Sequence, residues 1–175
     1  CEQFGNPSSL HKMGIAAAQL LKESRETVAQ AMGCTPAELF FTSGGTEGIN
    51  TAIFGAAQKN RHIGKHIVTT AIEHAATIQA CRRLESQGWE VTYVAPQADG
   101  HVPAQAVVDA LRDDTALVSV MLVSNEVGTV LPVAEIGAAL KRRNPQALFH
   151  VDAVLGLLRV PLTPKNWNCD LMSVS

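Results

Sequence analysis

The sequence predicts an α/β fold: a three-layer sandwich in which helices cover both faces of a mainly parallel β-sheet. Short β-rich runs alternate with helical patterns along the chain, and no repeat or low-complexity segment interrupts them. Residues 115–123 are almost entirely apolar, which is typical of a strand that is buried on both faces. Such sheets bind ligands beyond the carboxyl ends of their strands, so polar residues that follow the strands are the first candidates for a site.

Length and composition narrow the range of functions. The 175 residues suffice for one domain with a core, and 46% of them are hydrophobic. Charged residues make up only 17%, which indicates that a partner subunit or further sequence covers part of the surface. The net charge of −2 argues against a nucleic-acid partner or a membrane surface. No run approaches the roughly 18 apolar residues of a membrane-spanning helix, and no signal peptide is recognisable.

The four cysteines, Cys1, Cys34, Cys81 and Cys169, are scattered and form no C-x-x-C pair. This usage predicts reduced thiols in a cytoplasmic protein, with neither a disulfide framework nor a metal site. Cys1 is not an initiator methionine, and residues 171–175 resemble a strand that runs into a loop. The sequence therefore predicts a fragment of a longer protein.

The first elements are a leading loop and a long helix. Residues 4–9 are rich in turn formers, and Ser8 or Ser9 is available to cap the helix that follows. That helix is expected over residues 10–32, with Gly33 ending it. Pro36 suits the first position of a short helical turn.

A glycine turn follows at residues 40–50. Residues 40–42 suit a strand, and a helix to about residue 58 comes next, capped by Ser43 or Thr46. Gly44 and Gly45 leave room for backbone N–H groups to close on an anion. The pattern matches neither the dinucleotide nor the P-loop motif. Two interpretations remain: a phosphate site at the helix N-terminus, or an ordinary turn with a threonine cap.

The other elements continue the alternation. Strands are expected at residues 66–70, 89–94, 115–123, 147–151 and 169–174, and helices from Glu73 to about 87, at 103–111 and at 133–143. Polar clusters follow the strands at Ser43 to Thr46, Glu73 and His74, Ser124 to Glu126, Asp152, and Ser173 to Ser175. We expect these clusters to meet at one edge of the sheet.

Each polar candidate has a structural and a functional interpretation. Asp152 either caps a loop or pairs with Arg159, or else it pairs with a cationic ring nitrogen. His74 is either a surface or helix-start residue, or it stacks on an aromatic cofactor. Asn125 is either a turn residue or a donor to a phenolic oxygen. Together with a phosphate site, the functional set suits pyridoxal phosphate (PLP), because PLP has a phosphate, a pyridine nitrogen, a flat ring and a ring hydroxyl.

Several motifs resemble those of the cysteine desulfurases, a branch of the class V aminotransferase-like, fold-type I PLP enzymes. These motifs are residues 5–11 (GNPSSLH), 41–47 (FTSGGTE) with Asn50, Glu73-His74, 124–128 (SNEVG) and 150–154 (HVDAV). They follow the family order across nearly the whole chain. The resemblance implies an incomplete fold-type I large domain over residues 1–175, with residues 1–9 as a leading loop. The C-terminal part of that domain and the small domain would be absent.

The resemblance also implies a role for each candidate residue. Gly45, Thr46 and Ser175 would hold the cofactor phosphate, His74 would stack on the ring, Asn125 would reach the ring hydroxyl, and Asp152 would pair with the pyridine nitrogen. His74 and Asp152 would take part in catalysis as well as in cofactor binding. No metal is implied.

The chain departs from the family pattern at one position within it. Leu155 stands three residues after Asp152, where the family carries a glutamine that is a second donor to the ring hydroxyl. The family's Schiff-base lysine would lie three positions past Ser175, and its sulfur-accepting cysteine lies further on. We therefore expect this chain to be inactive by itself.

For the whole protein, the resemblance implies a transferase that takes sulfur from L-cysteine and leaves alanine and an enzyme persulfide. Such an enzyme would supply iron–sulfur cluster assembly or other sulfur-transfer pathways. It would be a homodimer with a sulfur-acceptor or scaffold protein as a further partner. Two alternatives remain: a selenocysteine lyase or another class V PLP enzyme, and a non-catalytic fragment or interaction module without the Schiff-base lysine.

Overall fold

The computed structural model describes residues 4–175, so Cys1 and the first part of the leading loop lie outside the described residues. The chain divides into two compact units, Cys1–Phe41 and Thr42–Ser175. The candidate residues named above all belong to the second unit.

The first unit contains the long helix α1 (Lys12–Met32) and the short 3₁₀ helix η1 (Pro36–Glu38). Gly33 ends α1 in the left-handed conformation, with φ of 65°, as expected. The predicted serine cap is wrong, because the side chain of His11 accepts the N–H of Gly14 instead, at 3.2 Å. Ser8 and Ser9 are still in the preceding turn, where their N–H groups both donate to Asn6.

Residues 40–42 do not form the expected strand. A β-strand needs a hydrogen-bonded neighbour, and no strand within residues 4–175 pairs with this segment. The side chain of Phe40 is 81% exposed, so the segment also lacks the burial that its apolar sequence suggested.

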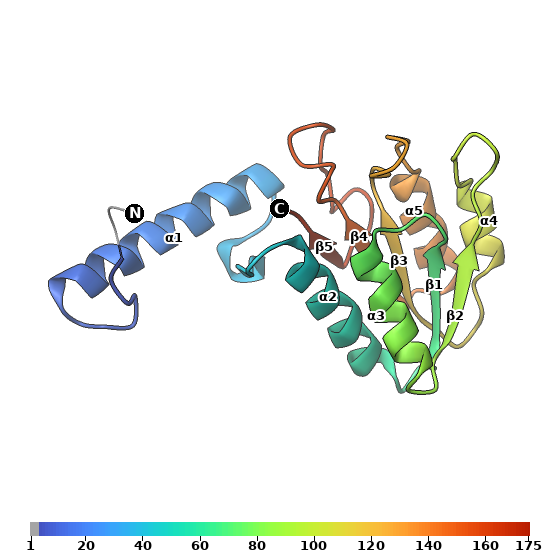
Figure 1. The fold of residues 1–175 in the computed structure, drawn as a ribbon, viewed down its shortest axis with the longest axis horizontal. Coiled ribbons are helices and arrows are strands. Elements are labelled where there is room, and N and C mark those ends of the chain that lie inside the picture. Colours follow the sequence, from blue (N-terminus) through green and yellow to red (C-terminus); the bar gives the residue numbers. More distant parts are fainter. Residues whose placement is uncertain (1–3) are drawn as a thin grey trace. The chain divides into compact units, whose positions relative to one another are not determined.

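The second unit is built on a five-stranded parallel sheet with the order β2-β1-β3-β4-β5 (Figure 1). The strands are β1 (His66–Thr70), β2 (Glu90–Val94), β3 (Thr115–Met121), β4 (Leu148–Asp152) and β5 (Leu171–Ser173). Every residue of β1 and of β3 is buried, as the apolar run at 115–123 predicted. Strand β3 ends earlier than expected, because the chain turns after it and Val123 forms an antiparallel bridge with Val130.

Helices cover both faces of the sheet and create two cores. Helices α2 (Gly45–Asn60) and α3 (Ala75–Glu85) pack together on one face, where Ile53 and Cys81 are fully buried against Leu117. Helices α4 (Ala104–Asp109) and α5 (Val133–Arg143) pack on the other face around Phe149 (Figure 1). The predicted α/β fold with a parallel sheet and three layers is therefore confirmed. Within the described residues, no helix combines the length and the apolar character needed to cross a membrane.

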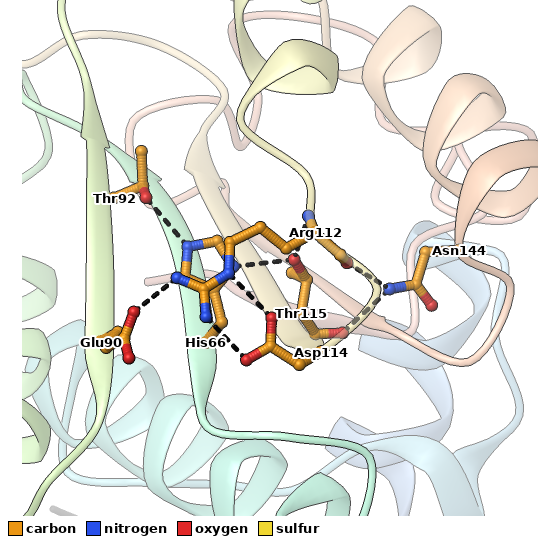
Figure 2. Close-up of polar contacts among 7 residues, drawn as sticks. All are labelled: His66, Glu90, Thr92, Arg112, Asp114, Thr115 and Asn144. Carbon is orange, nitrogen blue, oxygen red and sulfur yellow. Dashed lines mark hydrogen bonds and ion pairs between the residues drawn. The ribbon is translucent and has the colours of Figure 1, made fainter.

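A polar network ties the amino-terminal ends of three strands together (Figure 2). The buried ring of His66 contacts the hydroxyls of Thr115 and Thr92 at 2.8 and 2.9 Å. Arg112 donates two hydrogen bonds of 2.8 Å to Asp114 and a further one to Glu90. Burial, and then the nearby Arg112 charge, lower the pKa of His66. The polar side chains at the amino-terminal ends of these strands therefore bond to one another.

The strand order places the site at the opposite edge. Successive crossovers run outward in one direction from β1 to β2 and in the other from β3 to β5. The carboxyl ends of β1 and β3 therefore flank the point where the direction reverses, and parallel sheets of this order bind ligands at that point.

Candidate functional site

A cavity of about 360 Å³ opens at this edge of the sheet, a size within the range of small-molecule sites. Its lining residues are Gly45, Thr46, Ile49, His74, Met121, Val123, Asn125, Asp152, Val154 and Leu155. The structure thus brings five of the six predicted cofactor residues to one cavity. Ser175 is not among the lining residues.

The N-terminus of α2 contributes backbone N–H groups to this cavity. Gly44 is the N-cap and makes no side-chain capping bond, so the predicted cap by Ser43 or Thr46 is wrong. The N–H of Ser43 donates instead to the carboxylate of Glu47, which lowers the pKa of that carboxyl. The first N–H groups of a helix have no acceptor within it, and the helix dipole favours an anion there. This end of α2 therefore suits a phosphate group.

Gly45 leaves little room for a larger residue at the start of α2. A Cβ atom at this position would lie 2.8 Å from Cγ2 of Val154 and 3.6 Å from Cβ of Ser175. Ser175 is therefore next to the helix start, even though it does not line the cavity. The close approach explains why the turn carries glycine here.

His74 lies between the end of β1 and the start of α3. Its Nδ1 accepts the N–H of Ala76 at 3.1 Å, which makes it the N-cap of α3. In the neutral ring the proton is then assigned to Nε2. The helix-start interpretation is thus correct, and the exposed ring also lines the cavity.

Asp152 ends β4 and is only 5% exposed. Its Oδ1 accepts the N–H of Val154 at 3.0 Å. Burial raises the pKa of the carboxyl, while the Val154 hydrogen bond and the nearby His74 oppose that rise. The structural alternative of a pair with Arg159 is wrong, because the Arg159 guanidinium donates to the backbone oxygen of Leu155. No ion pair found within residues 4–175 involves Asp152, and such a carboxylate suits a cationic partner.

Asn125 lies in the loop that follows β3. The N–H of Gly128 donates to the Ser124 carbonyl at 3.0 Å, and the Ser124 N–H donates to the Thr129 carbonyl at 2.9 Å, so the loop is a closed turn. The exposed Asn125 amide donates to Glu126 at 2.9 Å. Asn125 is therefore a turn residue that also lines the cavity.

Leu155 is half-buried and forms part of the cavity wall. It adds to an apolar wall made by Ile49, Met121, Val123 and Val154, which sequence reasoning did not identify. The sequence signal that could have predicted this wall is that its residues lie close in the chain to the polar clusters.

Cys81 and Cys169 are not nucleophiles of this site. Cys81 and Cys169 lie apart from the cavity lining, and burial raises the pKa of each to about 12. A thiol with such a pKa stays protonated at neutral pH. Among the described residues no group of three or more His, Cys, Asp or Glu could hold a metal ion.

These residues fit PLP. The cavity joins a helix N-terminus for a phosphate, an unpaired buried carboxylate for a cationic ring nitrogen, an exposed imidazole face and an amide donor. The apolar wall supplies surface for the carbon skeleton of the ring.

Residues 2–175 match the family described as "Aminotransferase class-V". The chain belongs to this class V aminotransferase family. It is 46% identical over 172 residues to a "Putative cysteine desulfurase IscS 1" of Bacillus subtilis (strain 168). It is 45% identical over 174 residues to a "Cysteine desulfurase IscS" of Methanosarcina thermophila. These alignments cover 98% and 99% of this chain but 45% and 43% of the relatives.

Solved structures share the fold of this chain. A "NifS-like protein" superposes with a TM-score of 0.94 at 37% identity, covering 99% of this chain and 48% of the other. "SspA in complex with cysteine" superposes with a TM-score of 0.93 at 36% identity, covering 99% of this chain and 50% of the other. The chain thus spans about half the length of the proteins it matches. Its cysteine desulfurase relatives are PLP enzymes.

Proposed function

We propose that this chain is the N-terminal part of the large domain of a PLP-dependent cysteine desulfurase, with residues 1–9 as its leading loop. The observation that carries the proposal is the single cavity lined by Gly45, Thr46, His74, Asn125 and Asp152. The resemblance predicted these five residues from motifs that are far apart in the chain. The relatives named as cysteine desulfurases support the same activity.

Each residue has a physical role in this proposal. The free N–H groups at the start of α2 and the Thr46 hydroxyl hold the phosphate, with Ser175 as a further contact. Asp152 keeps the ring nitrogen protonated, and His74 covers the ring and takes part in proton movement near it. Asn125 donates a hydrogen bond to the ring oxygen. When bound, PLP with a protonated ring nitrogen would act as an electron sink for the bound substrate.

The substrate we propose is L-cysteine, whose sulfur would pass to an enzyme persulfide while alanine is released. The solved structure named as SspA in complex with cysteine supports this substrate. We further propose a homodimer that hands sulfur to an acceptor or scaffold protein for iron–sulfur cluster assembly or other sulfur transfer. The free thiols of Cys34, Cys81 and Cys169 suit a reducing, cytoplasmic setting.

Substitution of Asp152 tests the cofactor assignment. In the whole protein, Asp152→Asn removes the charge that pairs with the ring nitrogen, and charged hydrogen bonds contribute about 1.5–3 kcal/mol. We expect PLP affinity, measured by absorbance titration, to fall roughly ten- to hundredfold. Asp113→Asn is the matched control, because Asp113 is exposed and does not line the cavity. Equal PLP affinity in both variants would contradict the assignment.

Alanine and sulfide production then separate the remaining alternatives. A desulfurase releases alanine from L-cysteine above a free-PLP control, whereas a selenocysteine lyase strongly prefers selenocysteine. Another class V enzyme would bind PLP but release no sulfur. A non-catalytic module, which Leu155 would favour, would show neither turnover nor saturable PLP binding.

A further inference from the structure

Glu73 is a buried carboxyl group that the proposed function does not yet use. It lies between the end of β1 and His74, and it is 7% exposed. Its Oε1 accepts two hydrogen bonds, from the Thr70 hydroxyl at 2.6 Å and from the Met121 N–H at 2.9 Å. Its Oε2 is buried and has no hydrogen-bond partner among the described residues. The two oxygens of this carboxyl are therefore in very different environments.

This asymmetry favours a protonated carboxyl. An ionised carboxylate carries charge on both oxygens, and a buried charged oxygen without a donor is costly. The titratable groups that act on Glu73 offer no compensation, because they are Asp152 on β4 and Cys81 on α3. His74, the adjacent N-cap, acts on Asp152. Burial is the main reason why the pKa of Glu73 rises to about 8, and Asp152 adds to it.

The hydrogen bonds of Glu73 connect the carboxyl ends of two neighbouring strands. Thr70 ends β1, and Met121 ends β3 and pairs in register with Asp152 of β4. Met121 and His74 both line the cavity, so Glu73 lies directly behind it. By bridging Thr70 and Met121, the Glu73 side chain holds the carboxyl ends of β1 and β3 at a set separation.

We propose that Glu73 is a positioning residue that acts as a neutral carboxylic acid behind the cofactor cavity. It fixes the strand ends that present His74 and Met121, and its lack of charge leaves Asp152 as the one anion of this buried carboxyl pair. This inference rests on the proposed function, because an ionised Asp152 beside a neutral Glu73 matters only if Asp152 pairs with the ring nitrogen of PLP.

The test compares Glu73→Gln with the unaltered whole protein, because glutamine keeps the shape and the Oε1 acceptor but cannot ionise. In the PLP-free protein, a folded-state pKa above the unfolded value means that Glu73 costs stability as pH rises from about 4.5 to about 8. Glutamine lacks this cost. The thermal midpoint of Glu73→Gln minus that of the unaltered protein should therefore rise between pH 5 and 8 and then level off. Glu135→Gln is the matched control, since Glu135 is exposed on α5, and its difference should stay flat.

PLP affinity at pH 7 tests the positioning role. Glu73→Gln should keep the affinity within about threefold, whereas Glu73→Ala should lower it at least about tenfold, since the Met121 N–H loses its acceptor. Glu73→Asp, whose shorter side chain cannot bridge both donors, replaces the alanine variant if that protein does not fold.

The outcomes are distinct. A flat difference in thermal midpoint overturns the neutral-acid assignment, whatever the affinities. A rising difference with unchanged affinity in Glu73→Ala or Glu73→Asp overturns the positioning role. If the unaltered protein binds no PLP, the proposed function fails, while the PLP-free series still decides the protonation state of Glu73.

Discussion

Leu155 places an apolar side chain on a cavity wall where the resembling family has a hydrogen-bond donor. The cofactor oxygen would then have Asn125 as its main side-chain donor. A buried acceptor that gains one donor is stabilised by about 1–3 kcal/mol, or one to two decades in affinity. In the whole protein, Leu155→Gln should therefore raise PLP affinity at least about tenfold by absorbance titration.

The control for this variant is Leu158→Gln, because Leu158 is 96% exposed. It should change neither PLP affinity nor the thermal midpoint. If Leu155→Gln lowers the thermal midpoint and leaves PLP affinity unchanged, the new amide is buried without a partner, and the functional importance of position 155 is disproved.

At the scale of single elements, two glycines of α2 differ in their surroundings. A Cβ at Gly45 would lie 2.8 Å from Val154, which lines the cavity, whereas a Cβ at Gly55 would meet nothing within 4 Å. Gly45→Ala should displace the cavity wall and weaken PLP binding about tenfold. Gly55→Ala should leave binding unchanged and stabilise the protein by up to about 1 kcal/mol, because alanine favours a helix interior. Equal PLP affinity in the two variants would count against the close approach at Gly45.

A buried histidine in the middle of β4 joins β3, β4 and β5. The His150 ring contacts the hydroxyls of Ser119 and Ser173, each at 2.9 Å, and burial lowers its pKa to about 4. The folded state thus holds His150 neutral, while the unfolded chain takes up a proton near pH 6.5. Stability from this residue is complete above that pH and is lost as pH falls toward 4, on the order of 3 kcal/mol in total.

Thermal midpoints between pH 7.5 and 4.5 check this expectation. The unaltered protein should lose stability steadily over this range, and His150→Gln should show a shallower loss because one acid-sensitive group is gone. His62→Gln is the control, since His62 is exposed and should leave the slope unchanged. If His150→Gln and the unaltered protein show the same change of thermal midpoint with pH, His150 is not the group that causes the acid sensitivity.

At the scale of the whole molecule, the exposed apolar side chains of the first unit suit contact with a second subunit. Helix α1 exposes several apolar side chains, namely Met13, Ile15, Leu20 and Leu21, with exposed fractions of 40–58%. Large exposed apolar side chains gathered on one helix are typical of an interface. We expect the whole protein to be a homodimer by light scattering, and Ile15→Gln to shift it toward monomer. Lys22→Gln on the same helix is the control, and an active monomer at working concentration would contradict this expectation.

The sequence by itself determined the fold class and predicted the chain positions of the candidate site. Alternating strand and helix patterns, together with the fully apolar run at β3, are local features, and they require a parallel sheet with helices on both faces. The polar residues after the strands could then be assigned to one edge. Their meeting in one cavity follows from the parallel direction of the strands, which brings every carboxyl end to the same side.

Only the tertiary structure decided how each of these residues is placed. The N-caps of α1 and α2 are His11 and Gly44. The position of an N-cap depends on where the preceding turn ends, which residue type alone does not determine. Leu155 lies on the wall of the cavity and Ser175 lies beside it, because packing of α2 against β4 and β5 sets their distances. The isolation of one Glu73 oxygen depends on burial from several elements at once, which no local pattern contains.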